Sequence, residues 1–169
     1  AGGTVRLGDS ITADGGWTAA LPDRRVRNRG IAWDTTADLL ERLDDSLTGP
    51  PEVAVILIGT NDLEFGVAHA QTVRNTCLIL DRISAVAPAT RVALQAVLPR
   101  SDRYNTLVAP LNAALARVCG ERQVEFLDLT VHFAGPDGRL EPTMTDDGLH
   151  PNDVGHYRWV ELLREVLGS

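Results

Sequence analysis

Apolar residues along this chain follow two alternating patterns. Short runs that are apolar at every position are separated by longer stretches in which apolar residues recur every third or fourth position. The clearest short run covers residues 53–58, which are apolar on both faces, as a central strand of a parallel sheet must be. Gly49-Pro50-Pro51 breaks the chain just before this run. The pattern therefore predicts buried strands joined by amphipathic helices.

Five strands and four long helices account for most of the pattern. The strands are expected at residues 4–7, 25–28, 53–58, 91–97 and 123–127. The helices are expected from Asp34-Thr35 with the stripe Leu39, Leu40 and Leu43, over residues 70–87, around Leu107 to Val118, and from Asp153 with Trp159, Leu162, Leu163 and Val166 facing inward. This alternation predicts a doubly wound parallel sheet in a three-layer α/β/α sandwich. We expect one domain over residues 1–169.

Composition and charge narrow the choice of partners. The 169 residues carry a net charge of −7, and all sixteen basic residues are Arg. The acidic balance disfavours nucleic acid or an anionic membrane as the main partner, because binding either one requires a basic face. The absence of Lys excludes a lysine nucleophile and a Walker lysine. No run is long enough to span a membrane and no leader pattern opens the chain, so we expect a cytoplasmic protein.

Two cysteines, Cys77 and Cys119, each lie in an apolar helical pattern and form no CxxC pair. This predicts two reduced thiols in the core, with a disulfide as the alternative.

Polar residues gather where the predicted strands end. Ser10 follows the first strand, Gly30 the second and Asn61 the third, while Asp147 and His150 lie in the loop before the last helix. Ligand sites of such sheets lie beyond the carboxyl ends of the strands, so these four segments converge on one edge.

The chemistry that these residue types support is acyl transfer. A serine hydroxyl needs an adjacent base, and His150, oriented by Asp147, can serve Ser10 in that role. The N–H groups of Ser10 and Gly30 and the side-chain amide of Asn61 can stabilise an oxyanion. Asp146 is the competing orienting acid, but the three-residue spacing to His150 favours Asp147.

Four blocks in order now carry a family resemblance. They are Gly8-Asp9-Ser10-Ile11, Asn28-Arg29-Gly30-Ile31, Gly59-Thr60-Asn61-Asp62 and Asp147-Gly148-Leu149-His150-Pro151-Asn152. They resemble those of the SGNH (GDSL-type) hydrolases, and the intervening segments 34–40 and 97–100 resemble the small bacterial branch similar to platelet-activating-factor acetylhydrolase subunits and sialate O-acetylesterases. The resemblance implies Ser10 as nucleophile, Asp147 and His150 as its triad partners, and Gly30 and Asn61 as oxyanion donors. It also implies a flavodoxin-like sheet and no cofactor.

One departure from that pattern bears on the substrate. Trp33 stands where relatives of this branch often carry Gly. A ring pointing into the site would form a small acyl pocket, whereas the alternative is that Trp33 packs in the core against the helix of Leu39 and Leu40.

Other polar residues have ordinary interpretations. His156 could complete a metal site with Asp147 and His150. Its spacing places it inside the last helix, however, so those two residues have no evident third strong ligand. We favour a structural histidine and expect no metal. Arg100 and Arg103 could meet an anionic substrate group, although a solvated loop is the favoured interpretation.

The sequence thus predicts a serine esterase that removes a short acyl group, such as acetyl, from the oxygen ester of a small molecule. The alternatives are a thioesterase or lysophospholipase for longer chains, an acyltransferase, and a non-catalytic module that binds acylated glycans. The resemblance to acetylhydrolase subunits is compatible with a homodimer.

Overall fold

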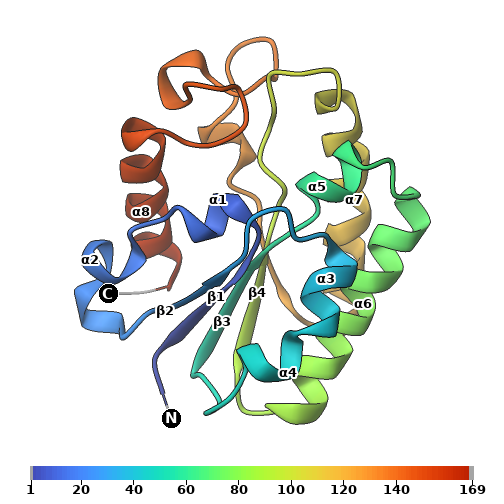
Figure 1. Cartoon of the computed structure of the whole chain (residues 1–169), viewed down its shortest axis with the longest axis vertical. Helices are drawn as coiled ribbons and strands as arrows, with labels where there is room; N and C mark the ends of the chain where they lie inside the picture. The colour runs from blue at the N-terminus through green and yellow to red at the C-terminus, as the bar shows by residue number, and fades with distance from the viewer. Residues whose placement is uncertain (1, 168–169) are drawn as a thin grey trace.

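A five-stranded, all-parallel sheet forms the centre of the protein, whose computed structural model describes residues 2–167 (Figure 1). Its strands are β1 (Thr4–Gly8), β2 (Arg27–Gly30), β3 (Val53–Leu57), β4 (Arg91–Gln95) and β5 (Glu125–Leu127). Their spatial order is β2-β1-β3-β4-β5, the order of flavodoxin-like sheets. The expected sheet and its class are therefore confirmed.

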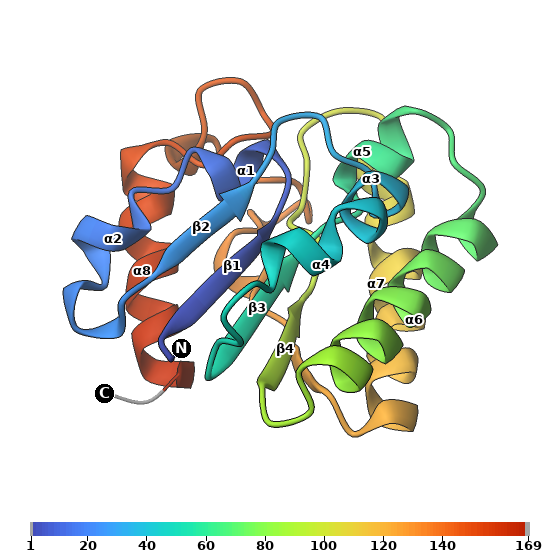
Figure 2. The same cartoon turned by 60° about the horizontal axis from the view of Figure 1, so that its bottom comes forward.

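Helices cover both faces of this sheet (Figure 2). One face carries α3 (Thr36–Glu41), α4 (Leu43–Ser46), α6 (His69–Val86) and α7 (Asn105–Arg122), and the other carries α1 (Ser10–Ala13), α2 (Trp17–Ala20) and α8 (Asp153–Leu167). Strand β3 shows why both faces are apolar. Ala54 and Ile56 belong to the first core, whereas Val55 and Leu57 belong to the second, and all four are at most 2% exposed.

The structure shifts some predicted boundaries. The second strand begins two residues later than expected, because the 3₁₀ turn Pro22–Arg24 and the left-handed Arg25 (φ 43°) precede it. Thr35, not Asp34, caps α3, in a capping box with Asp38. The short helices α1, α2 and α5 (Thr60–Glu64) were not predicted, since four or five residues are too few to show a helical period.

Both cysteines are free, as predicted. Cys119 is buried, and burial raises the pKa of its thiol to about 11. Cys77 is only half-buried, at the edge of the core. Over residues 2–167, no helix is long and apolar enough to cross a membrane.

Candidate active site

Ser10 lies at the carboxyl edge of the sheet, where β1 gives way to α1. The preceding residue, Asp9, caps this helix: its Oδ1 accepts a hydrogen bond from the N–H of Ile11 at 3.0 Å. Ser10 is thus the first residue of α1, and its N–H is one of those left free at a helix start.

Ser10, His150 and Asp147 form a continuous chain of hydrogen-bonding atoms. The Oγ of Ser10 lies 2.9 Å from Nε2 of His150, and Nδ1 of His150 lies 2.6 Å from Oδ2 of Asp147. The carboxylate favours the tautomer with the proton on Nδ1, which leaves Nε2 to accept the Ser10 hydroxyl. Residues separated by 140 positions in the sequence are therefore arranged as a nucleophile, a base and an orienting acid.

Asp147 is held by its own loop. Its Oδ1 accepts hydrogen bonds from the backbone N–H groups of Leu149 (2.9 Å) and His150 (2.8 Å). Partial burial raises the pKa of the carboxyl, but the bonds from the His150 ring and from these N–H groups outweigh it and lower the pKa to about 2. Asp146 instead accepts a bond from Asn152. Asp147 is therefore the acid that the structure places on His150.

Gly30 packs directly against the helix that carries Ser10. A Cβ at position 30 would lie 2.3 Å from the backbone nitrogen of Ala13 and 2.8 Å from the carbonyl oxygen of Asp9. Only glycine fits this close approach. The N–H of Gly30 donates to Oδ1 of Asn28 at 2.9 Å, so binding an oxyanion would require Gly30 to share this hydrogen or Asn28 to release it.

Asn61 projects from the first turn of α5 and is 3% exposed. Gly59 precedes this helix with φ 124°, a conformation that only glycine adopts readily. The Nδ2 of Asn61 donates one hydrogen to the carbonyl of Asp34 at 2.9 Å. The amide has a second hydrogen, which remains for a ligand.

The neighbouring Asp62 is fully buried and fixes α5 in place. Its carboxylate accepts bonds from the N–H and Oγ1 of Thr36 at 2.9 and 2.5 Å, and from Thr72 at 3.2 Å. These bonds tie α5 to α3 and α6, so the position of Asn61 depends on both helices.

Asp9 is a buried acid that the sequence singled out only as part of a block. It is 1% exposed, and burial raises the pKa of its carboxyl to about 7. Nothing in the sequence pattern distinguishes such a carboxyl from a solvated helix cap.

Arg100 is buried, so the prediction of a solvated loop and the alternative of a substrate contact are both wrong for this residue. It is 2% exposed, because its guanidinium is used within the protein. Nη1 donates to the carbonyl and hydroxyl of Thr60 at 3.0 and 3.1 Å, Nη2 donates to Glu64 and Asp102, and Nε donates to Asp102. Arg103 lies at the surface against Tyr104.

Trp33 is neither buried nor packed in the core, so the core alternative is wrong. The residue is 67% exposed, and its ring stacks on that of Phe65 with centroids 6.3 Å apart and planes inclined by 25°. Its φ is 71°, in the left-handed region that favours glycine. The role of Trp33 beside a substrate stays a prediction.

His156 packs between aromatic residues away from the Ser10–His150 pair. Its ring stacks on Trp159 (5.8 Å, 21°) and meets Trp17 edge-on at 6.0 Å. Across residues 2–167 we find no cluster of three or more His, Cys, Asp or Glu residues suited to hold a metal ion.

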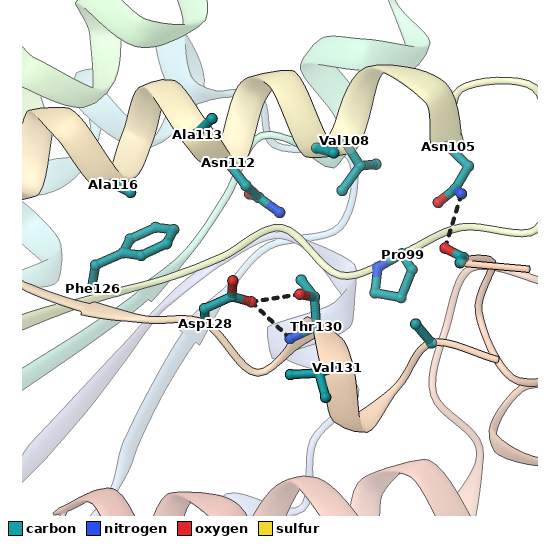
Figure 3. A pocket seen from close by; sticks show the side chains of 13 residues that line it. Pro99, Asn105, Val108, Asn112, Ala113, Ala116, Phe126, Asp128, Thr130 and Val131 are labelled. Atoms are coloured by element: carbon teal, nitrogen blue, oxygen red, sulfur yellow. Dashed lines mark hydrogen bonds between the residues drawn. The ribbon is translucent and has the colours of Figure 1, made fainter. Parts of the chain in front are cut away.

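A hollow of about 440 Å³ lies apart from these residues, between α7 and the segment that follows β5 (Figure 3). Its wall includes Val108 and Ala113 of α7, Phe126 of β5 and Val131. None of the residues that line it belongs to the Ser–His–Asp arrangement.

The fold and site together define the class of protein: an α/β protein with a serine, a histidine and an aspartate in contact at the carboxyl edge of a flavodoxin-like sheet. The sequence profile of the GDSL-like Lipase/Acylhydrolase family matches residues 7–158. The chain belongs to this family.

Solved structures agree with this assignment. A Streptococcus pneumonia protein, provisionally described as a platelet activating factor, is 27% identical and superimposes with a TM-score of 0.93 over 98% of this chain and 84% of its own. A GDSL-like lipase from Bacteroides thetaiotaomicron is 24% identical, with a TM-score of 0.84 over 97% of this chain and 86% of its own. The second likeness shows the shared fold.

The curated relatives are viral structural proteins that are much longer than this chain. The chain is 30% identical to the major and the minor capsid protein of Enterobacteria phage T3, in an alignment of 142 positions that covers 78% of the chain. It spans only 40% and 32% of those two proteins.

Proposed function

We propose that the chain is a serine ester hydrolase that acts through an acyl-enzyme on Ser10. The observation that carries the proposal is the unbroken contact from Ser10 Oγ through the His150 ring to the Asp147 carboxylate. A serine hydroxyl at a sheet edge has no structural need for both partners, whereas nucleophilic catalysis requires them.

In the first half of the reaction, Ser10 Oγ forms a bond to the ester carbonyl carbon while His150 Nε2 takes the hydroxyl proton. The carbonyl oxygen becomes an oxyanion. The free N–H of Ser10 and the second hydrogen of Asn61 are the readiest donors to it, with Gly30 as the third. The bond from carbon to the alcohol oxygen then breaks, and His150 delivers its proton to that leaving oxygen.

In the second half, water takes the place of the alcohol. His150 removes a proton from the water as its oxygen attacks the acyl carbon, and the same donors hold the second oxyanion. The bond to Ser10 Oγ breaks, His150 returns the proton to Ser10, and the carboxylic acid leaves. No group other than water is consumed.

The acyl group is the open part of this proposal. We expected a preference for a short acyl group such as acetyl because the Trp33 ring, if it pointed into the site, would close one end of a small acyl pocket. A ring that is 67% exposed provides a surface instead, so Trp33 is retained here as a substrate contact and not as the end of a pocket.

A panel of p-nitrophenyl esters from acetate to laurate tests the proposal. The wild-type chain should hydrolyse members of the panel, and Ser10→Ala should lower kcat by about 10³–10⁶-fold. Ser84→Ala, which changes an exposed serine of α6, is the matched control and should behave as wild type. Turnover that survives Ser10→Ala would refute the assignment.

A further inference from the structure

We propose that Trp33 and Phe65 form an aromatic shelf that binds an apolar, unbranched acyl group of the ester substrate. This inference rests on the proposed function, because it assigns one side of the same site. It differs from the short acyl group that the sequence favoured.

The two rings form an exposed pair. Trp33 is 67% exposed and Phe65 is 55% exposed, and they stack on each other with centroids 6.3 Å apart. Single exposed apolar residues are ordinary on protein surfaces, but a stacked aromatic pair offers a continuous apolar area. Ile31, next to Gly30 in the chain, adds a further side chain that is 49% exposed.

Both rings are attached to the segments that carry the oxyanion donors. Phe65 follows Asn61 by four residues, and its N–H donates to the Asn61 carbonyl at 2.9 Å, so it stands one helical turn from Asn61. Trp33 lies in the loop after Gly30, and the carbonyl of the next residue, Asp34, binds the Asn61 amide at 2.9 Å. The shelf is thus joined to the oxyanion side of the site through Asn61.

The direction of the reaction assigns this side to the acyl group. The leaving alcohol oxygen must face His150, which protonates it, and the oxyanion must face its donors. The third substituent of the tetrahedral carbon is the Ser10 Oγ, which faces His150, and the fourth is the acyl chain, which is directed away from His150. Trp33 and Phe65 belong to the segments of Gly30 and Asn61, not to the loop of His150, so they flank the acyl side.

The backbone of Trp33 shows that local stability does not explain this residue. Its φ of 71° lies in a region that side chains rarely adopt and that glycine adopts freely. A large ring held in this conformation, and left mostly exposed, gains little from folding. A contact between this ring and an apolar ligand would explain why a large side chain is kept at this position.

The experiment compares kcat/KM for p-nitrophenyl octanoate and acetate. The wild-type ratio should favour octanoate by about twofold for each methylene in contact with the shelf. A twofold factor corresponds to half of the free energy that is gained when a methylene is fully buried. Trp33→Gly and Phe65→Ala should each lower this ratio by about three- to tenfold. The double variant should lose less than the sum of the two, because the rings act as a pair.

Two controls separate binding from folding. Tyr157→Ala removes an aromatic residue of α8 that is 69% exposed, and it should leave the octanoate-to-acetate ratio unchanged. Trp33→Gly should unfold at a temperature no lower than wild type, since glycine suits the left-handed backbone. A fall in the ratio without a fall in unfolding temperature would therefore report lost substrate contact.

Three results would overturn the shelf. A ratio that is unchanged in both variants would show that the rings do not touch the acyl group. A ratio that rises in Trp33→Gly would show that the ring obstructs long chains, which is the short-acyl alternative. In both cases hydrolysis of acetate that depends on Ser10 would leave the proposed function standing, whereas a wild-type chain inactive on both esters would remove the function and the shelf together.

Discussion

At the scale of single residues, Asn61 combines an observed structural contact with a proposed role in catalysis. One of its amide hydrogens anchors the loop at Asp34, and the other is available where negative charge would develop in the transition state. Asn61→Ala should therefore lower kcat by about 10²–10³-fold with little change in KM. Steady-state kinetics on the acetate ester measure both constants. If KM alone rose, Asn61 would be a binding residue and the oxyanion donors would have to be reassigned.

Asp9 makes stability depend on pH in an unusual direction. Its folded-state pKa of about 7 lies above its unfolded value because of burial. As the pH rises from about 4 to 7 the unfolded chain loses this proton while the folded chain keeps it, so Asp9 lowers the free energy of unfolding across that window. The effect is on the order of 4 kcal/mol at most. Asp147 acts oppositely: its contribution is present above about pH 4 and is lost as the pH falls toward 2.

Asp9→Asn tests this account, because asparagine stays neutral and its oxygen can still accept the Ile11 N–H. Its free energy of unfolding, relative to wild type, should be higher at pH 8 than at pH 5. Urea denaturation at the two pH values gives the comparison. If the difference in free energy of unfolding between Asp9→Asn and wild type were the same at pH 5 and pH 8, a buried carboxyl that ionises near neutrality would be contradicted.

At the scale of elements, the segment after β4 joins the two halves of the site. Arg100 donates to Thr60 and Glu64 of α5, the helix of Asn61. The next residue, Ser101, donates its N–H to the carbonyl of Gly148, in the loop of Asp147 and His150, at 2.8 Å. This segment therefore sets the position of Asn61, the proposed oxyanion donor, relative to Ser10, His150 and Asp147, the proposed triad.

Arg100→Met should change the distance between Asn61 and the Ser10–His150–Asp147 group. It leaves the Thr60 carbonyl without its buried donor, which costs about 1–3 kcal/mol, and it should lower kcat more than it raises KM. Arg100→Lys keeps a charge without the planar fork and should recover part of kcat. Arg82→Met breaks an exposed ion pair with Asp44 and is the matched control. A loss of stability with kcat unchanged would show that Arg100 is only a structural residue.

Sequence periodicity predicted the long elements and missed the short ones for one reason. A buried strand such as β3 or a helix such as α6 repeats its pattern often enough to be recognised, whereas α5 does not. The positions of the four sequence blocks after the predicted strands and before the last helix predicted that Ser10, Asn61 and His150 lie at one edge of the sheet. The burial of Arg100, the exposure of Trp33 and the bond from Gly30 to Asn28 depend on contacts between distant segments, and no local pattern encodes them.

At the scale of the whole molecule, the parallel topology assembles the site. Each strand runs in the same direction, so segments that follow β1, β2, β3 and β4 all emerge at one edge, where the loop before α8 meets them (Figure 1). This arrangement places Ser10 2.9 Å from His150 although 140 residues separate them. The central claim, that Ser10 is the activated nucleophile, is a consequence of this topology.

Labelling with a p-nitrophenyl alkylphosphonate tests that claim most directly, because such a reagent reacts with a serine that a neighbouring base activates. The intact mass should rise by one phosphonyl group, and peptide mapping should place it within Gly8-Asp9-Ser10-Ile11. Ser10→Ala should remain unlabelled under the same conditions, while Ser84→Ala should react like wild type. Equal labelling of Ser10→Ala, or a phosphonyl group on another residue, would contradict the account.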